Sequence, residues 1–418
     1  MRDETEHGPS FADLRPMKEP TFVEPGRVTF PVYPDLPERL LDDKIHPDPD
    51  GVLPHVLATL SAYAYAGYDQ GCDAGTVAMM ATRLGLEDNR CRVFEQRVDA
   101  LYVSSAAYLL QDRERRVAIL CYRGTQPEDI ISILTDADVH PETLRVDLDG
   151  VTHEVHAGFY RNMRATRYLI LQALDRAVRG ESVDPREEGT YGDGLEALYI
   201  TGHSLGAAMA ALMAVTLVHE PRYAHIARRL RAVYTFGQPM LGGPDFARAC
   251  ERATDSNGTR LLRDRLLRYI YDRDVVPALP PRPVGPYAPF GREFHYRRPR
   301  HGVDAAFAAL ADAAAEAVSL PGDLLTGTGP LPRLRRLVAV PRRAREQGWV
   351  ERRDPALPYP QMDSLAGLAV VAPLAFFAAR LALTRSLPFK YSFEDHGPGR
   401  YVNALAPEGV LSEFGDVR

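Results

Sequence analysis

The chain has 418 residues, of which 45% are hydrophobic, 25% are charged and 9% are aromatic. These fractions are ordinary for a folded globular protein and exclude disordered, fibrous and collagen-like classes. Fifty Lys and Arg against 56 Asp and Glu give a formal net charge of -6, which argues against nucleic-acid binding because that function needs a basic surface. The four cysteines form no C-x-x-C pair and no Cys/His zinc spacing, so we expect no metal site.

The first part of the chain is rich in Pro, Asp and Glu and has no clear hydrophobic period. We therefore predict that residues 1–52 form an extended N-terminal arm. The first residues are charged and lack the apolar core of a secretory signal, which favours a cytoplasmic protein. The Leu- and Tyr-containing run at 55–65 then predicts a helix.

Short apolar runs and helical patterns alternate over residues 100–280. Two apolar runs, 102–110 and 116–122, flank a polar turn and predict a β-hairpin, whose second strand is apolar throughout and fits a central position. Helices are predicted at 158–179 and 205–217, and strands at 197–201, 232–236 and 267–271. This alternation indicates an α/β fold with a mostly parallel sheet flanked by helices, which we assign to a core domain at residues 53–296.

A different composition begins after the core, at residues 297–390, which we interpret as a basic and apolar helical insertion. Residues 331–353 hold eight Arg and two Glu, a local charge of +6, and Leu365–Ala379 carries no charge. One interpretation is that residues 331–383 make a peripheral contact with an anionic membrane surface. The alternative is a helical subdomain whose Arg side chains face solvent. Residues 391–418 form a C-terminal segment.

A nucleophile motif lies between the strand at 197–201 and the helix at 205–217. It reads Gly202-His203-Ser204-Leu205-Gly206, which is G-x-S-x-G directly after a strand and before a helix. The two glycines remove side chains from a tight turn, so that the Ser204 hydroxyl stands at the edge of the sheet. The Leu205 N–H is then a candidate oxyanion donor at the start of the helix.

A serine nucleophile needs a base and an orienting acid, and in α/β-hydrolase-like chains both follow the serine. The favoured acid is Asp274, which follows the strand at 267–271, and Asp272 is its rival. Three histidines lie downstream of Asp274, namely His295, His301 and His396.

Five motifs in order give the chain a resemblance to the class 3 (fungal-type) lipases of the α/β-hydrolase superfamily. They read C-Y-R-G-T, H-A-G-F, G-H-S-L-G, Y-T-F-G-Q-P and D-V-V-P, at residues 121–125, 156–159, 202–206, 234–239 and 274–277. The resemblance implies hydrolysis of lipid esters without a cofactor. It makes Ser204 the nucleophile, Asp274 the triad acid and Thr125 an oxyanion residue, and it gives His203 a supporting role in the elbow.

The same resemblance favours His396 as the base. Its surroundings, Asp395-His396-Gly397-Pro398-Gly399, are similar to the D-H segment that opens a final helix in bacterial and diacylglycerol-lipase-like members. His295 remains the alternative base, because its segment loosely resembles that of compact fungal members. We expect His301 to be a solvated loop residue and Asp395 to cap the following helix.

The stretch after Thr125 is the position of the lid in that family. It carries a short apolar cluster made of Ile130, Ile131, Ile133 and Leu134, although the Trp usual in the family is missing. The predicted function is a lipid-directed serine ester hydrolase, most simply an acylglycerol lipase. The alternatives are a phospholipase A1 or diacylglycerol-type lipase and, in a different class, a non-catalytic lipid-binding protein on the same fold.

Overall fold

A computed structural model gives the fold of most of the predicted core domain. The residues it describes are 31–42, 51–66, 73–98, 103–124, 141–148, 150–254, 258, 260–281, 284–298, 348–352, 394–407 and 410. Within this part of the chain, no helix is both long enough and apolar enough to cross a membrane. Leu365–Ala379 lies outside the described residues.

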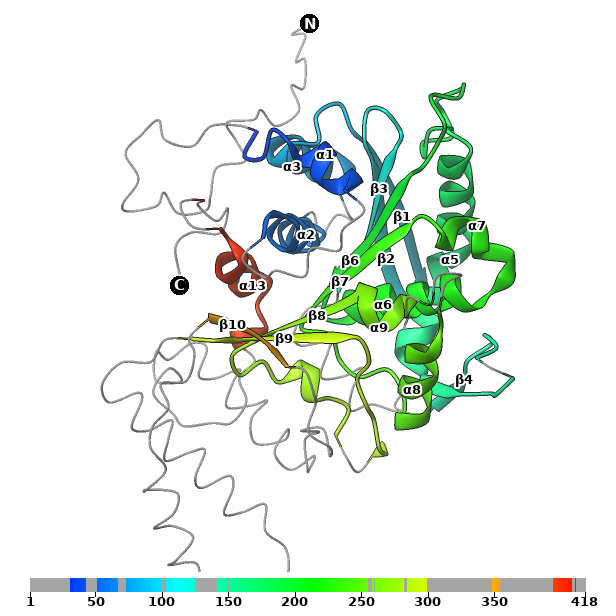
Figure 1. Cartoon of the computed structure of the whole chain (residues 1–418), viewed down its shortest axis with the longest axis vertical. Coiled ribbons are helices and arrows are strands. Elements are labelled where there is room, and N and C mark those ends of the chain that lie inside the picture. The colour runs from blue at the N-terminus through cyan, green and yellow to red at the C-terminus, as the bar shows by residue number, and fades with distance from the viewer. Residues whose placement is uncertain are drawn as a thin grey trace, which may run out of the picture.

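An eight-stranded sheet with the strand order β1-β2-β3-β6-β7-β8-β9-β10 forms the centre of the molecule (Figure 1). Its central strands β3, β6, β7, β8 and β9 are parallel, and antiparallel strands pair at both edges. The bounds are β1 Arg90–Val98, β2 Val103–Gln111, β3 Val117–Tyr122, β6 Ala197–His203, β7 Leu230–Phe236, β8 Leu266–Tyr271, β9 Arg292–Arg297 and β10 Gly348–Arg352. A separate two-stranded sheet pairs β4 (Pro141–Thr143) with β5 (Glu154–His156).

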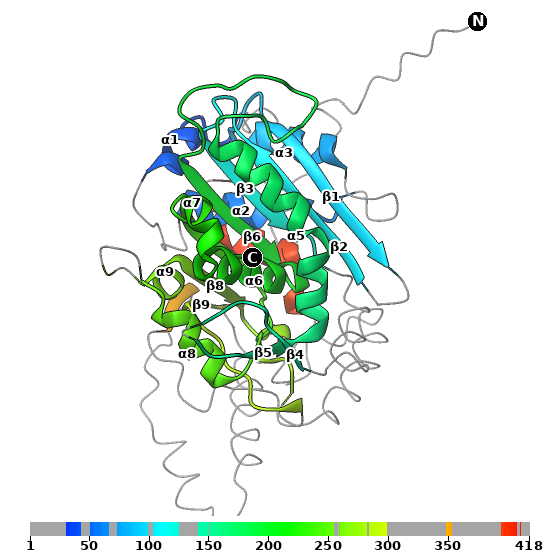
Figure 2. The same cartoon turned by 90° about the vertical axis from the view of Figure 1, so that its right-hand side faces the viewer.

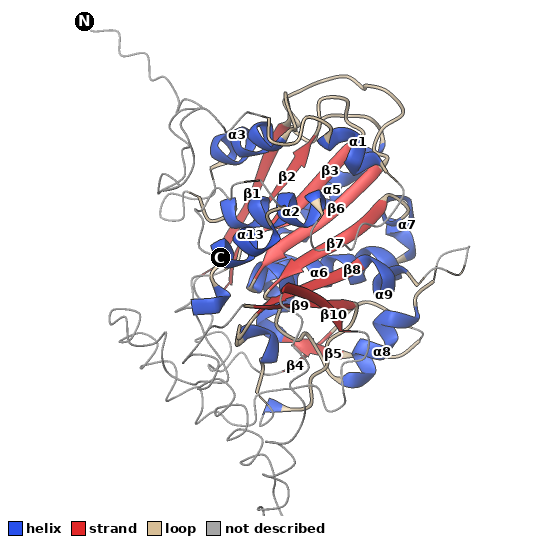
Figure 3. Ribbon diagram, turned by 60° about the vertical axis from the view of Figure 1, so that its left-hand side comes forward, coloured by secondary structure: helices blue, strands red, loops and turns tan. Residues whose placement is uncertain are grey.

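Helices cover both faces of the sheet. On one face lie α1 (Leu36–Leu41), α2 (Val52–Tyr63), α3 (Ala74–Leu84) and α13 (Pro398–Leu405) (Figure 3). On the other lie α5 (Ala157–Val178), α6 (Leu205–His219), α7 (Ala224–Ala227), α8 (Pro244–Arg252) and α9 (Leu261–Arg265) (Figure 2). Short 3-10 turns occur at Pro221–Tyr223, Val276–Ala278 and Glu394–His396.

Each face of the sheet has its own apolar core because side chains alternate along a strand. Along β3, Ala118 and Leu120 pack with α5 and α6, whereas Val117 and Ile119 pack with α1, α2 and α13. All six β3 residues are buried, as in a strand that is covered on both faces. Helix α6 is buried along nearly its whole length, which explains its uniformly small and apolar sequence.

The predicted α/β fold with a mostly parallel sheet is confirmed. The two apolar runs at 102–110 and 116–122 form the antiparallel pair β2–β3, and β3 is central, as its sequence suggested.

Two details differ from the domain boundaries that we predicted. Part of the range assigned to an extended arm forms α1, because Leu36 and Leu40 are fully buried against the core. Within the range assigned to a helical insertion, residues 348–352 form β10, which pairs with β9 at the edge of the sheet. The single Trp of the chain, Trp349, packs there on Tyr269 and Tyr296 and explains why this segment joins the sheet.

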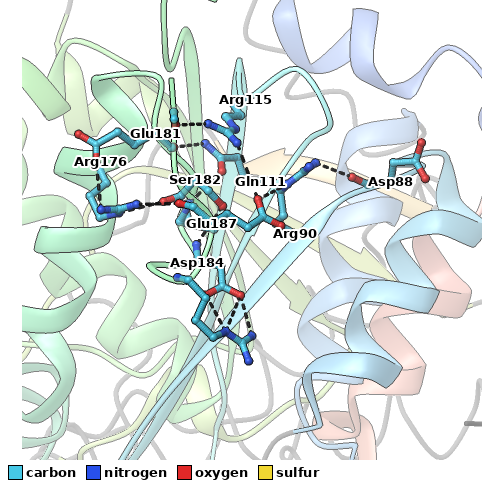
Figure 4. Close-up of polar contacts among 12 residues, drawn as sticks. Asp88, Arg90, Gln111, Arg115, Arg176, Glu181, Ser182, Asp184 and Glu187 are labelled. Carbon is cyan, nitrogen blue, oxygen red and sulfur yellow. Dashed lines mark hydrogen bonds and ion pairs between the residues drawn. The ribbon is translucent and has the colours of Figure 1, made fainter. Parts of the chain in front are cut away.

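A polar cluster fixes the β2–β3 turn to the loop after α5 at the end of the sheet (Figure 4). Buried Arg115 donates from Nη1 to the carbonyl oxygens of Gly180 and Gly189, at 3.0 and 2.8 Å. Gln111 donates to the Glu181 carbonyl and accepts from the Val183 amide. The guanidinium therefore supplies hydrogen bonds to two loop carbonyls, one of which belongs to buried Gly180.

Replacing Arg115 by Met is expected to lower the free energy of unfolding by about 2 kcal/mol, because the Gly180 and Gly189 carbonyls each lose a hydrogen bond from a charged donor. Arg113 in the same turn is the matched control, since both it and its partner Asp88 are largely exposed. Arg113→Met should change stability by no more than about 0.5 kcal/mol. Urea unfolding of both variants measures the difference, and equal stabilities would contradict the structural role given to Arg115.

Candidate active site

Ser204 occupies a strained turn between β6 and α6. Strand β6 ends at His203, helix α6 begins at Leu205, and Ser204 between them has φ 61° and ψ -128°. A non-glycine residue adopts this conformation only where its surroundings impose it, and such strain is typical of functional sites. The Ser204 amide donates to the Phe236 carbonyl at 2.9 Å, which fixes the turn to the end of β7.

The two glycines of the motif permit this turn by close backbone approach. A Cβ on Gly202 would lie 2.5 Å from the carbonyl carbon of Gly206, and a Cβ on Gly206 would lie 2.2 Å from the Tyr122 carbonyl oxygen. Both distances are far inside van der Waals contact, so neither position accepts a side chain. The motif therefore has a steric basis in β3, β6 and α6.

Asp274 and His396 form a buried pair at the same edge of the sheet. The Asp274 oxygens lie 2.8 and 3.0 Å from His396 Nδ1, and both side chains are almost completely buried. Asp274 comes from the turn after β8, and His396 comes from the last residue of the 3-10 turn before α13. Asp274 Oδ1 also accepts from the Val276 amide, and its Oδ2 accepts from the Tyr401 hydroxyl.

This arrangement defines the proton positions on His396. Because an ionised carboxylate only accepts hydrogen bonds, Nδ1 carries the proton and Nε2 is left to accept one. His396 Nε2 and Ser204 Oγ are both buried, and neither has a hydrogen-bond partner within the described residues. In free enzymes the bond between nucleophile and base is often long and tightens only with substrate.

The Asp274–His396 pair lies against the backbone segment that holds the Ser204 amide. Gly237 directly follows Phe236, the residue that binds the Ser204 amide, and has φ 59°. A Cβ on Gly237 would lie 2.7 Å from Asp274 Oδ2 and 2.8 Å from His396 Cε1. The Gly237 backbone thus packs directly against Asp274 and His396. The F-G-Q-P motif needs glycine at this position because of its positive φ and because a Cβ would clash with both side chains.

Both ring nitrogens of His203 bind groups other than Ser204. Its Nε2 donates to the His396 carbonyl oxygen at 2.7 Å, so its Nδ1 accepts from the Tyr65 hydroxyl at 2.9 Å. Complete burial holds the pKa of His203 well below its usual value and keeps the ring neutral, and a positive charge on His396 would lower this pKa further. Its ring also lies 4.5 Å from that of His396.

Of the predicted oxyanion residues, only Leu205 is described. It opens α6, so its amide is among the four that have no acceptor within the helix. Thr125 lies outside the described residues, as do the lid candidates Ile130, Ile131, Ile133 and Leu134. Gly124, which precedes Thr125, is described, and a Cβ on it would lie 3.2 Å from Ser204 Cβ.

The rival residues have other partners. His295 on β9 binds Glu293 at 2.6 Å, and Glu293 in turn pairs with buried Arg268. The Asp272 amide donates to the Tyr296 carbonyl, while the carboxylate on His396 is that of Asp274. His301 lies outside the described residues.

Asp395 has a different role from the helix cap that we predicted. Gly397 is the N-cap of α13, and no side chain caps that helix. Asp395 Oδ1 instead accepts from Arg298 at 2.6 Å, and Oδ2 accepts from the Arg273 amide at 3.4 Å. Burial raises the pKa of Asp395 to about 6, although the Arg298 charge opposes this rise.

Two tyrosines of the site were not assigned to it from the sequence. Tyr65 binds His203, and fully buried Tyr401 binds Asp274 and also accepts from the Tyr271 amide at 3.2 Å. Tyr401 lies in the middle of α13. Its place five residues after the histidine was visible in the sequence, but its direction toward Asp274 depends on how α13 meets β8.

Comparisons with known proteins find a family and several relatives that are similar to part of this chain. Residues 119–284 match the model of the family described as Lipase (class 3). Phospholipase A1-II 6 of Oryza sativa subsp. japonica is 39% identical over 196 residues, which are 43% of this chain and 43% of the relative. Triacylglycerol lipase OBL1 of Arabidopsis thaliana is 38% identical over 81 residues, 19% of this chain and 14% of the relative.

The chain therefore spans less than half the length of these two relatives. Among solved structures, lipase II from Rhizopus niveus aligns with 58% of this chain and 79% of its own, at 22% identity and a TM-score of 0.43. The matched region begins within β3 and extends past the turn after β8, so it includes Ser204 and Asp274. Residues 119–284, which include the strained serine turn, are thus similar to the class 3 lipase family.

Proposed function

We propose that this protein is a lipid-directed serine ester hydrolase in which Ser204, His396 and Asp274 form the catalytic triad. The observation that carries the proposal is the buried Asp274–His396 pair beside a serine held in a strained turn at the start of a helix. A carboxylate that orients an imidazole near a serine hydroxyl is the arrangement that activates serine for attack on an acyl carbon.

In the proposed reaction Ser204 Oγ attacks the ester carbonyl carbon while His396 Nε2 takes the hydroxyl proton. Asp274 holds the imidazole in the required tautomer and stabilises its charge. The Leu205 amide and Thr125 stabilise the oxyanion, and His396 then gives its proton to the departing alcohol oxygen. Water attacks the resulting acyl-serine with the same base, which releases the carboxylic acid and restores Ser204.

Ser204→Ala is expected to lower kcat for a p-nitrophenyl acyl ester by about 10⁶, because the covalent route is lost. The wild type should be labelled by a fluorophosphonate at Ser204, and the variant should not. Equal hydrolysis by both proteins would overturn the proposal. Absence of labelling in the wild type, combined with binding to lipid vesicles, would favour the non-catalytic lipid-binding alternative.

The substrate is proposed at the level of lipid esters, with acylglycerols first. One similar protein is named a phospholipase A1 and another a triacylglycerol lipase, which keeps phospholipase A1 and diacylglycerol-type activity as the alternatives. Comparing release of fatty acid from triacylglycerol, diacylglycerol and phosphatidylcholine emulsions separates them. Hydrolysis of the phospholipid at the higher kcat/KM would replace the acylglycerol proposal.

We also propose peripheral contact with anionic membranes through residues 331–383, on the basis of their charge. The +6 of residues 331–353 lies in a chain of net charge -6, and basic segments bind anionic lipid surfaces. Residues 348–352 belong to β10, so the contact is assigned to the Arg residues before them. Reversal of Arg335, Arg336, Arg342 and Arg343 to Glu should weaken sedimentation with phosphatidylserine vesicles at low salt, and unchanged sedimentation would contradict the contact.

A further inference from the structure

Strand β10 lies between β9 and His396 in the chain and forms the last strand of the sheet. Strand β10 pairs antiparallel with β9, with Trp349 opposite Tyr296 and Arg352 opposite Glu293. The described chain resumes at the turn that carries His396 and continues into α13, which lies on the sheet face near β10 (Figure 1). Strand β10 therefore lies close to α13, the helix that follows His396.

Trp349 contacts the end of α13 directly. Its ring lies 5.3 Å from those of Tyr269 and Tyr296, and its indole Nε1 donates to the Ala404 carbonyl at 2.8 Å. Ala404 is in the last turn of α13, where the backbone carbonyls have no N–H donor within the helix. The indole N–H, which can only donate, thus supplies the hydrogen bond that this helix end lacks.

Arg298 makes a second contact, with the turn that precedes α13. It follows β9 and donates from Nη2 to Asp395 Oδ1 at 2.6 Å, and its guanidinium lies 5.7 Å from the centre of the Tyr271 ring. Asp395 is almost completely buried and is the neighbour of His396. The ion pair therefore fixes the backbone one residue from the imidazole.

Helix α13 needs such ties because it has only eight residues and no side-chain cap at its start. Helices of this length are unstable by themselves and depend on tertiary contacts. Tyr401 holds its middle through Asp274 and the Tyr271 amide. Trp349 and Arg298 hold the end of the helix and the turn before it.

We propose that Trp349 and Arg298 are positioning residues, which set the place of His396 relative to Ser204 through Ala404 and Asp395. The inference rests on the proposed function, since it gives these residues a role in the reaction of the triad. A displacement of about 1 Å in a catalytic group can cost up to about 10² in rate. Loss of either tie is therefore expected to lower kcat without changing the contacts of Ser204 itself.

The test uses Trp349→Phe, which keeps an aromatic ring but loses the hydrogen bond, and Arg298→Met, which keeps the length of the side chain but loses the charge. Each is expected to lower kcat roughly tenfold with KM unchanged. Rates are expressed per serine labelled at the end point by a fluorophosphonate, so that unfolded protein does not contribute. Arg298→Lys should restore most of the loss.

Glu351→Gln is the matched control. Glu351 is also on β10 and pairs with Arg292 of β9 at 2.8 Å. The change therefore weakens the contact between β9 and β10 without removing a contact to α13. This variant should keep kcat within twofold, with the emission of the single Trp unchanged. Equal kcat per labelled serine in the wild type, Trp349→Phe and Arg298→Met would overturn the inference while the labelled wild type upheld the proposed function. A wild type without labelling would overturn both.

Discussion

Replacing His396 by Ala is expected to lower kcat by about 10⁵–10⁶, nearly as much as loss of Ser204, because members of a triad act as one unit. Without the imidazole no group accepts the serine proton, and the Asp274 carboxylate loses its main partner. Steady-state hydrolysis of a p-nitrophenyl ester, together with the rate of fluorophosphonate labelling, measures the effect. KM should change little, since the imidazole acts mainly in the transition state.

His295→Gln is the matched comparison because His295 was the alternative base. Gln keeps a donor for Glu293, the residue that His295 binds on β9. We expect this variant to retain kcat within about threefold. A larger loss in His295→Gln than in His396→Ala would assign the base to β9 and overturn the triad.

The second large effect is expected for Asp274→Asn, which should lower kcat by about 10⁴. The amide is nearly the same size as the carboxylate, but its NH₂ group can donate to His396 Nδ1 and favours the tautomer that carries its proton on Nε2. That tautomer cannot accept the serine proton. With its oxygen in the Oδ1 position the amide still accepts from the Val276 N–H, and its NH₂ group then faces His396 Nδ1 and the Tyr401 oxygen, which can accept, so the fold is expected to be preserved.

Asp272→Asn serves as the control for Asp274→Asn. Asp272 has φ 36°, a conformation that Asn adopts readily, and it precedes Asp274 by two residues. The control should keep activity within about threefold and should melt at the temperature of the wild type. If Asp272→Asn lowered kcat by about 10⁴ and Asp274→Asn remained active, the triad acid would be Asp272 and not Asp274.

Local features of the site were predictable because neighbouring residues produce them. The turn at Ser204 depends on Gly202 and Gly206, which lie within two residues of it in sequence, and on the strand and helix on either side. The place of Asp274 after β8 follows from a short apolar run that ends in a turn. These elements were identified from alternation of apolar segments, which reflects burial on both faces of the sheet.

Contacts across long stretches of chain could not be predicted in the same way. His295 and His396 both follow Asp274, and only the packing of α13 on β8 and α2 brings His396 to that carboxylate. Asp395 was expected to cap α13, yet it binds Arg298 at a separation of 97 residues. Strand β10 was also missed, because a five-residue strand inside a basic stretch has too little pattern to be recognised.

By itself the sequence determined the α/β class, the serine turn and the order of the five motifs, since each depends on residue types over a few positions. It also determined the charge distribution, in which residues 331–353 hold +6 and the rest of the chain holds -12, that is, -6 minus +6. The tertiary structure alone decided which imidazole meets Asp274 and which side chains hold that imidazole. Such contacts form between segments that are distant in sequence, and their geometry depends on how helices and strands pack on the sheet.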